Sequence, residues 1–267
     1  MRMIGLVVFL AVPAAAQWIN LPTPGIPRSR DGKPNLSASA PKTSAGKPDF
    51  SGMWVPRDIL PCDPKDRGVQ CTELPLTPQV LNFASGLKGG LPYRPWAAEL
   101  VKNRTKDVAY IDPHTHCMPP NFPRAWAFPE SEKIFQTPTE LVILHEFNAA
   151  YRQIFFDGRK LPEDMLPAWN GYSIAHWDGD TLVVESAGYR DDSWLDTAGN
   201  FFSGEARVTE RIRRPNFGSL DIDVTVDDTK VFTQPWTVAL HMRPLVDTEM
   251  IDFMCQENNK DLDHFVR

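Results

Sequence analysis

The sequence predicts a mainly β protein in which antiparallel strands form a meander that closes into a barrel behind a proline-rich extension. Nineteen of the 25 prolines lie at or before Pro129, and a proline cannot donate to a strand ladder. From Lys133 onward, short runs of β-branched and aromatic residues alternate with turn residues, a pattern typical of consecutive strands. A sandwich of two β-sheets remains the alternative architecture.

The first 16 residues have the pattern of a secretory signal peptide. Arg2 precedes an apolar run over residues 3–12, and Ala14 to Ala16 supply the small residues of a cleavage site. An apolar run of about ten residues is too short to cross a bilayer. We therefore expect a periplasmic or extracellular protein without a membrane span.

The rest of the chain divides by composition into an arm and one β-rich domain. Residues 17–48 are rich in Pro, Gly, Ser and Lys and predict an extended arm. The domain, residues 49–267, is expected to contain an irregular wrap over 49–130, a β-meander over 131–258 and a tail over 259–267. Within the wrap we expect a strand over 50–54 and helices over 77–84 and 96–106.

The meander is divided by turn signals, of which Asp178-Gly179-Asp180 is the strongest. The expected strands cover residues 133–137, 140–146, 150–156, 172–178, 181–187, 205–213, 219–226, 230–242 and 248–255. Eight or nine sequential strands joined by short turns favour an up-and-down barrel over an open sheet.

Four cysteines follow the predicted cleavage site, and an even number in an exported chain indicates two disulfides. We favour Cys62–Cys71, because the residues between them can form a tight loop. That pairing leaves Cys117–Cys255, which would fasten the wrap to the end of the meander.

Charge restricts the class of partner. The formal net charge is −6, and the acidic residues are spread along the chain. Phosphate binding needs a basic face, so a nucleic-acid partner is disfavoured. A small organic molecule is the expected partner, and the sequence does not indicate an oligomeric state.

Strand alternation predicts that several charged side chains point into the barrel. Glu210, Glu146, Glu249 and Arg152 each share a strand face with apolar residues. Buried charges must pair, titrate or line a wet cavity. The two interpretations are an internal ion-pair network and a pocket whose floor holds a general base. Under the second, Glu210 or Glu146 would be the base.

The histidines admit further roles. His176 lies mid-strand, either as an ordinary half-buried residue or as a proton shuttle beside Tyr172. His114 and His116 have a spacing that could place two metal ligands on one face, but the other ligands would come from distant segments. We expect no resident metal or cofactor, and instead either a loop packed under the disulfide or His116 lining the cavity.

Two arginines and several aromatic residues complete the candidate ligand site. Arg124 and Arg159 could clamp a carboxylate, or could instead satisfy loop carbonyls and carboxylates at the barrel rim. Segments 157–159 and 169–172 flank a proline-containing loop, which brings Trp169 and Tyr172 to the same candidate site. Tryptophans such as Trp169 could stack on an aromatic or sugar ligand or belong to the core.

Two resemblances bear on these expectations. Gly52-x-Trp54 resembles the G-x-W motif of lipocalins and related calycins, which implies a barrel. The chain from residue 91 to 258 also resembles a widespread family of exported, largely uncharacterised bacterial proteins. The matching blocks include RQIFFDGR at 152–159, WNGYS at 169–173, WDGDTLVV at 177–184, TER at 209–211, QPWT at 234–237 and CQEN at 255–258. Where relatives tend to carry Gly-x-Pro-His-Ser, this chain has GNFFS at 199–203. The family resemblance implies no established reaction.

The leading functional hypothesis is binding of a small, partly apolar organic molecule in the barrel mouth. The alternatives are a cofactor-independent isomerase or lyase, with Glu210, Glu146 or His176 as base and Arg152 or Arg124 stabilising an anion, and a structural or partner-binding envelope protein.

Overall fold

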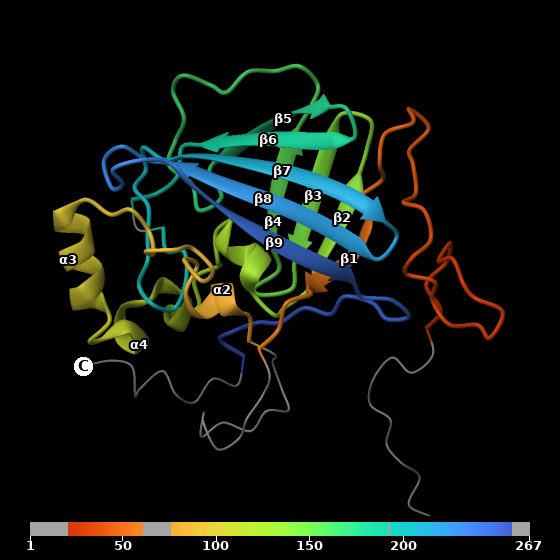
Figure 1. Ribbon diagram of the computed structural model, residues 1–267, viewed down its shortest axis with the longest axis horizontal. Helices are drawn as coiled ribbons and strands as arrows, with labels where there is room; N and C mark the ends of the chain where they lie inside the picture. Colours follow the sequence, from red (N-terminus) through yellow and green to blue (C-terminus); the bar gives the residue numbers. More distant parts are fainter. Residues whose placement is uncertain (1–20, 61–75, 192, 258–267) are drawn as a thin grey trace, which may run out of the picture.

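The computed structural model describes residues 21–60, 76–191 and 193–257, and its strands form one closed barrel (Figure 1). Each strand pairs with the next along the chain, and the first pairs with the last. The strands are β1 (Gly52–Pro56), β2 (Glu132–Gln136), β3 (Glu140–His145), β4 (Ala150–Phe155), β5 (Tyr172–Asp178), β6 (Thr181–Ala187), β7 (Arg207–Asn216), β8 (Ser219–Asp227) and β9 (Trp236–Pro244). The prediction of a mainly β barrel is confirmed.

The helical segments of the described chain are short and lie in the wrap. They are α2 (Pro78–Leu81), α3 (Pro95–Arg104), α4 (Val108–Ile111) and the 3₁₀ turns η1 (Pro113–His116) and η2 (Arg124–Ala127). The hydroxyl of Thr77 caps α2 by accepting from Val80 N, as the sequence predicted, but the helix already ends at Leu81. No helix of the described residues is both long and apolar enough to cross a membrane.

One pairing differs from the expected antiparallel meander. β4 and β5 run parallel, joined only at Ile154 with Ser173 and at Phe155 with Ile174. The connection, residues 156–171, is long enough to return the chain to the end of the barrel where β4 began (Figure 1). The barrel is therefore mixed, with its weakest seam between β4 and β5.

The C-terminal part of the meander also differs. The predicted strand over 230–242 begins only at Trp236, because Val231 and Phe232 donate their backbone N–H groups to the carbonyl of Asp228 in a turn. The predicted strand over 248–255 is absent, and that segment keeps only a bridge between Phe147 and Phe253.

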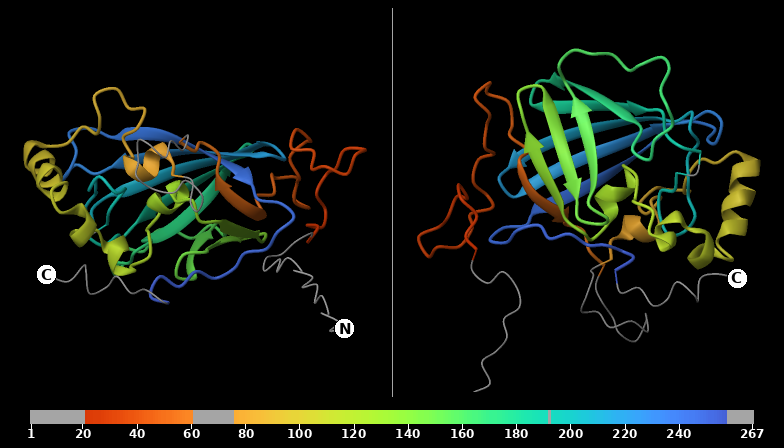
Figure 2. Two further views of the ribbon diagram at one scale, coloured as in Figure 1. Left: turned by 90° about the horizontal axis from the view of Figure 1, so that it is seen from below. Right: turned by 180° about the vertical axis from the view of Figure 1, so that it is seen from behind.

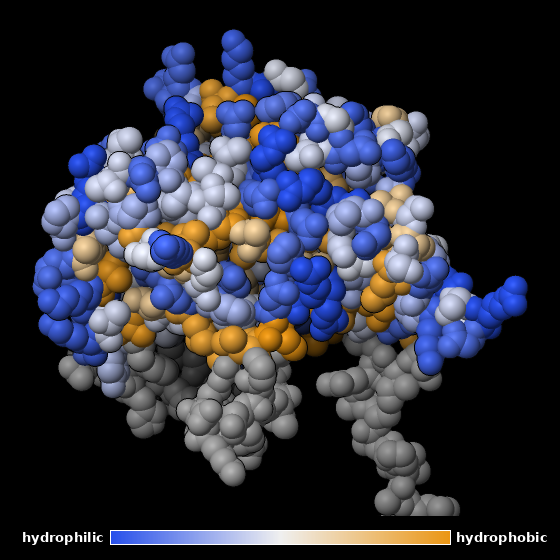
Figure 3. Space-filling model, viewed as in Figure 1, coloured by the Kyte–Doolittle hydropathy of each residue, from blue (hydrophilic) through white to orange (hydrophobic). Residues whose placement is uncertain are grey.

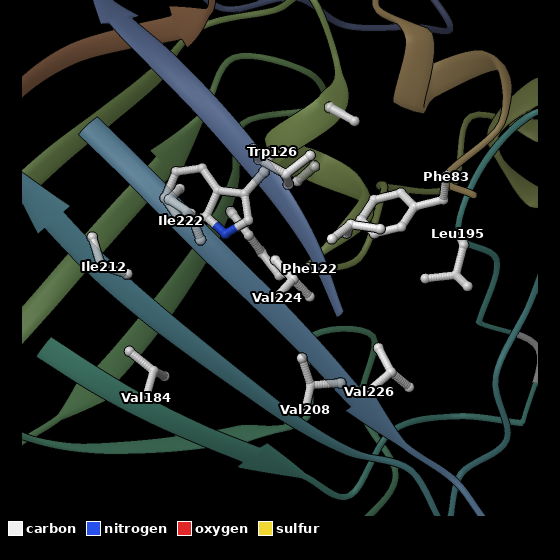
Figure 4. Close-up of a cluster of buried hydrophobic side chains, with 14 of the residues drawn as sticks. Phe83, Phe122, Trp126, Val184, Leu195, Val208, Ile212, Ile222, Val224 and Val226 are labelled. Carbon is white, nitrogen blue, oxygen red and sulfur yellow. The ribbon is translucent and has the colours of Figure 1, made fainter. Parts of the chain in front are cut away.

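Segment 121–128 forms a plug that fills the barrel, within the region predicted to be an irregular wrap. Phe122, Trp126 and the alanines beside Trp126 are almost fully buried. Figure 4 shows Trp126 beside Ile222 of β8 and Phe122 beside Val224. The interior is thus packed by side chains of the plug and of the strands.

The N-terminal arm and the helices lie at opposite ends of the barrel (Figures 1 and 2). At the β7–β8 turn, Phe217 N donates to Ala38 O and Gly218 N to Leu36 O, each at 2.8 Å. Much of the face shown in Figure 3 is hydrophilic, with apolar residues between the polar ones.

The disulfide between Cys117 and Cys255 is present and fastens the segment after β9 to the turn after η1. The other predicted pair, Cys62 and Cys71, lies outside the described residues.

Candidate functional site

A buried ion pair lies in the barrel interior. Arg152 of β4 donates from Nη1 to Oε1 of Glu210 on β7 at 3.0 Å, and a second hydrogen bond joins Nη2 to Oε2. Trp126 of the plug donates its indole N–H to Oε1 of Glu210 at 2.6 Å. The carboxylate therefore ties the plug to the barrel wall, and the predicted inward orientation of both charged residues is confirmed.

Two serines on the intervening strands complete this network. Arg152 donates from Nε to Ser173 Oγ at 3.2 Å and from Nη2 to Ser186 Oγ at 2.9 Å. The ring of Phe122 lies under the guanidinium, 4.7 Å from centroid to Cζ. Burial alone would lower the pKa of Arg152, but the charge and hydrogen bonds of Glu210 raise it above its ordinary value. Because both oxygens of Glu210 are bonded and buried, the internal ion-pair interpretation holds for these residues.

A pocket of about 430 Å³ opens at the weak seam between β4 and β5. We call it the β4–β5 pocket. It is lined by Tyr151, Arg152, Gln153, Phe155, Arg159, Ala168, Trp169, Asn170, Gly171, Tyr172 and Ser173. Because the parallel pairing covers only two residue pairs, the earlier part of β4 faces the loop before β5 instead of a strand. Four predicted ligand residues, Arg152, Arg159, Trp169 and Tyr172, meet here.

Three aromatic residues of the β4–β5 pocket, Phe155, Trp169 and Tyr172, contact another ring or an arginine. The rings of Phe155 and Tyr172 lie 5.6 Å apart, and the guanidinium of Arg159 lies 3.8 Å from the centroid of Phe155. Arg190 lies over the ring of Trp169 at 4.8 Å. These contacts hold the rings in defined orientations on an otherwise exposed surface.

Arg159 is exposed but held in place. It donates to the carboxylate of Asp157 at 2.6 Å from Nη2 and to the hydroxyl of Tyr172 at 2.9 Å from Nη1. The hydrogen bonds of Asp157, and next that of Tyr172, raise the pKa of Arg159, and those of Arg159 lower the pKa of Asp157. The predicted partnership of Arg159 with Arg124 does not form.

Arg124 and His116 lie elsewhere. Arg124 is buried in the plug and makes two hydrogen bonds to Asp112, at 2.8 and 2.5 Å. The exposed His116 donates from Nε2 to the carbonyl of Tyr110 at 2.6 Å. Among the described residues, no group of three or more His, Cys, Asp or Glu side chains is arranged to hold a metal ion.

Glu146 and Glu249 do not point into the barrel as predicted. On β3 the buried face is that of Leu141, Ile143 and His145, so Glu146 lies on the other face and accepts from Ser131 N at 3.0 Å. The prediction correctly placed Glu146 on the same face as Val142 and Leu144. It was wrong in assuming that this face points into the barrel.

His176 is exposed rather than half-buried, and the prediction for Glu249 fails for a reason of its own. The inner face of β5 carries Ser173, so His176 is exposed, 4.0 Å from Glu185 on the outer surface. Glu249 lies in the irregular segment after β9, where alternation does not apply, and it accepts from Lys133 Nζ at 2.6 Å. A catalytic role for Glu146 or His176 would therefore have to be exercised outside the barrel.

The sequence interpretation missed a second group of buried titratable residues. Glu132 and His145 are almost fully buried and directly opposite each other on β2 and β3, and Glu130 lies just before β2. The signal was available in principle, because antiparallel strands joined by a short turn place these positions in register once the turn is located. Residue 132 was predicted to precede the strand, so its pairing was not considered.

Comparisons with protein-family models, with curated proteins and with solved structures gave no match to this chain.

Proposed function

We propose that this protein binds a small organic molecule with a planar, partly apolar body in the β4–β5 pocket. The observation that carries the proposal is the pocket itself, whose 430 Å³ falls in the range typical of small-ligand sites. Its lining combines the faces and edges of Tyr151, Phe155, Trp169 and Tyr172 with the guanidinium of Arg159. The pocket lies on the wall of the barrel rather than in its mouth.

The polar groups of the pocket indicate what else the ligand carries. The hydroxyl of Tyr172 accepts from Arg159, which leaves the proton of this hydroxyl free to donate to a ligand. Nη1 and Nη2 of Arg159 each retain an N–H beyond their bonds to Tyr172 and Asp157. A hydroxyl, carbonyl or carboxylate oxygen on the ligand could accept hydrogen bonds from these donors.

The binding function is favoured over the cofactor-free enzyme by the positions of the proposed bases. Glu210 is buried with both oxygens bonded, and Glu146 and His176 lie on the outer faces of their strands. None of these three residues lines the β4–β5 pocket. Glu210 is connected to it only through the buried Arg152, which lines the pocket and bonds to Glu210. Export to the periplasm or the extracellular medium belongs to the same proposal, supported by the signal-peptide pattern and by the Cys117–Cys255 disulfide.

The test uses a planar anionic probe, 1-anilinonaphthalene-8-sulfonate, titrated into the protein and followed by its fluorescence. Trp169→Ala should weaken binding about tenfold or more, which corresponds to ~1.4 kcal/mol. The control is Trp96→Ala on α3, an exposed tryptophan outside the pocket. Equal affinity of Trp169→Ala and Trp96→Ala would remove the β4–β5 pocket as the binding site. Native mass spectrometry of the protein from its own host would identify a co-purifying ligand.

A further inference from the structure

Glu132 and His145 face each other inside the barrel without the hydrogen bonds that buried polar groups normally make. They are directly paired across β2 and β3, and Nδ1 of His145 lies 3.6 Å from Oε1 of Glu132. Their side chains are 0% and 1% exposed. Within the described residues, no polar side-chain atom of either residue has a hydrogen-bond partner. The contrast with Arg152 and Glu210, which are satisfied throughout, makes this pair exceptional.

Among the residues that the structure describes, none brings a positive charge within hydrogen-bonding distance of Glu132. Two further carboxyls act on it, Glu130 just before β2 and Glu146 just after β3, and Oε2 of Glu130 is also buried without a partner among the described residues. Its neighbour on β1 is Trp54, which brings no charge. Burial, and then the charges of Glu130 and Glu146, raise the pKa of Glu132 well above its usual range.

The surroundings of His145 oppose protonation of its ring, chiefly through burial. Burial and the neighbouring His114 lower the pKa of His145 to about 3. His114 belongs to η1, where burial and Arg124 lower its own pKa to about 4 despite the opposing effect of Asp112. A neutral imidazole retains one nitrogen that accepts a hydrogen bond, and this is the partner that a protonated carboxyl needs.

We propose that Glu132 and His145 form a proton-binding site inside the barrel, with the proton held on Glu132 at neutral pH and donated as a hydrogen bond to His145. A small change of side-chain torsion shortens the 3.6 Å separation to hydrogen-bonding distance. The proton removes the uncompensated buried charge that an ionised Glu132 would leave. This site is distinct from the β4–β5 pocket and does not depend on ligand binding there.

The direct test is infrared spectroscopy of protein labelled with ¹³C-carboxyl glutamate, recorded at pH 8. Burial raises the pKa of Glu130 to about 6, so Glu130 is ionised at this pH and does not interfere. A labelled carbonyl band of a protonated carboxyl is expected in the wild type, lost in Glu132→Gln and retained in Glu140→Gln. Glu140 is the matched control, because it lies on the same hairpin and is partly exposed. Absence of the band from the wild type would overturn the proposal even if Glu132→Gln failed to fold.

The pH dependence of stability supplies a second test. A raised pKa in the folded state gives stability that is complete below the unfolded value and is lost as pH rises through the folded value. The melting temperature of Glu132→Gln should therefore rise relative to the wild type between pH 5 and pH 8. Nitrogen chemical shifts of His145 should show a neutral ring throughout this range. An imidazolium ring at pH 7, or a melting-temperature difference that is independent of pH, would refute the assignment of the proton to Glu132.

Discussion

Arg152 and Glu210 show the conditions under which two full charges are tolerated inside a barrel. The guanidinium bonds to both carboxylate oxygens and to two serine hydroxyls, and the carboxylate also accepts from Trp126. Each charge is thus compensated by its partner and by neutral donors or acceptors. Removing one partner leaves the other charge buried and uncompensated. The resulting loss of stability is larger than the net stability that the intact pair contributes.

Glu210→Gln is therefore expected to lower the free energy of unfolding by ~3–5 kcal/mol, the usual cost of breaking a buried pair. Urea unfolding followed by tryptophan fluorescence measures the effect. The matched control is Glu140→Gln, at a partly exposed position that accepts from Gln153. The double variant Arg152→Met, Glu210→Leu should lose less than Glu210→Gln alone. If Glu210→Gln were as mild as the control, the pair would not be the anchor that its geometry indicates.

At the scale of single residues, the sequence predicts orientation well only where one face of a strand is clearly polar. On β7, Glu210 lies among Val208 and Ile212, and the opposite face carries Thr and Arg side chains. On β3 both faces are apolar, because Val142 and Leu144 lie outside, so alternation could not decide which face contains Glu146. Trp126 enters the barrel from a segment that is not a strand, so strand alternation cannot predict that its side chain is buried.

Among the elements, the start of β5 depends on Gly171. This residue has a φ of +59°, and a Cβ added to it would lie 2.5 Å from the carbonyl oxygen of Ala187 on β6. Gly179, in the turn between β5 and β6, has a similar φ of +61° but no atom within 4 Å of an added Cβ. The two glycines therefore separate the cost of the backbone conformation from the cost of the close contact.

Gly179→Ala is expected to lower the free energy of unfolding by ~1 kcal/mol, the cost of a left-handed conformation for alanine. Gly171→Ala adds a steric conflict at the edge of the β4–β5 pocket, so a further ~1–3 kcal/mol should be lost. Thermal unfolding of the two variants side by side measures the difference. Equal losses would show that β5 can shift away from Ala187 without penalty, and that the pocket wall is softer than its packing indicates.

Local sequence patterns predicted where strands begin and end better than they predicted which segments pair with each other and in which direction. The turn at residues 178–180 correctly separates β5, which ends at Asp178, from β6, which begins at Thr181. The parallel direction of β5 against β4 depends on where the intervening loop delivers the chain, which no local pattern encodes. Segment 248–255 alternates like a strand, but Asn148 binds the backbone of Cys255 there instead of a neighbouring ladder.

At the scale of the molecule, three parts far apart in sequence converge on one barrel. The plug enters one end, the disulfide fastens the final segment beside it, and the arm lies at the other end (Figures 1 and 2). The composition of the sequence predicted an irregular region before a β region, and strands β2 to β9 all lie after residue 131. It could not show that part of the irregular region fills the core, because burial of the plug is decided by the shape of the barrel interior.

The attachment of the arm to the barrel is a property of the whole molecule, and a substitution that adds one carbon atom, Gly218→Ala, can test it. The hairpin between β7 and β8 donates two backbone hydrogen bonds to the arm, from Phe217 N and Gly218 N. A Cβ at Gly218 would lie 2.6 Å from Cβ and 2.7 Å from the carbonyl oxygen of Leu36, so Gly218→Ala should separate the arm from the turn. Losing both hydrogen bonds would cost roughly 2 kcal/mol, while the barrel itself stays closed.

Limited trypsin digestion distinguishes attachment from mere proximity, because the arm contains cleavable sites after Arg28, Arg30 and Lys42. In the wild type these sites should be cut slowly, and in Gly218→Ala they should be cut rapidly to leave a resistant barrel. Ser219→Ala, one residue further along, should behave like the wild type. Rapid cleavage of the wild-type arm would show that the contacts with the β7–β8 turn do not hold it, and the barrel would then be stable without the extension that precedes it. Slow cleavage in all three proteins would mean that the ion pair of Arg28 with Asp247 and the bond from Lys47 Nζ to Gly179 O suffice to hold the arm.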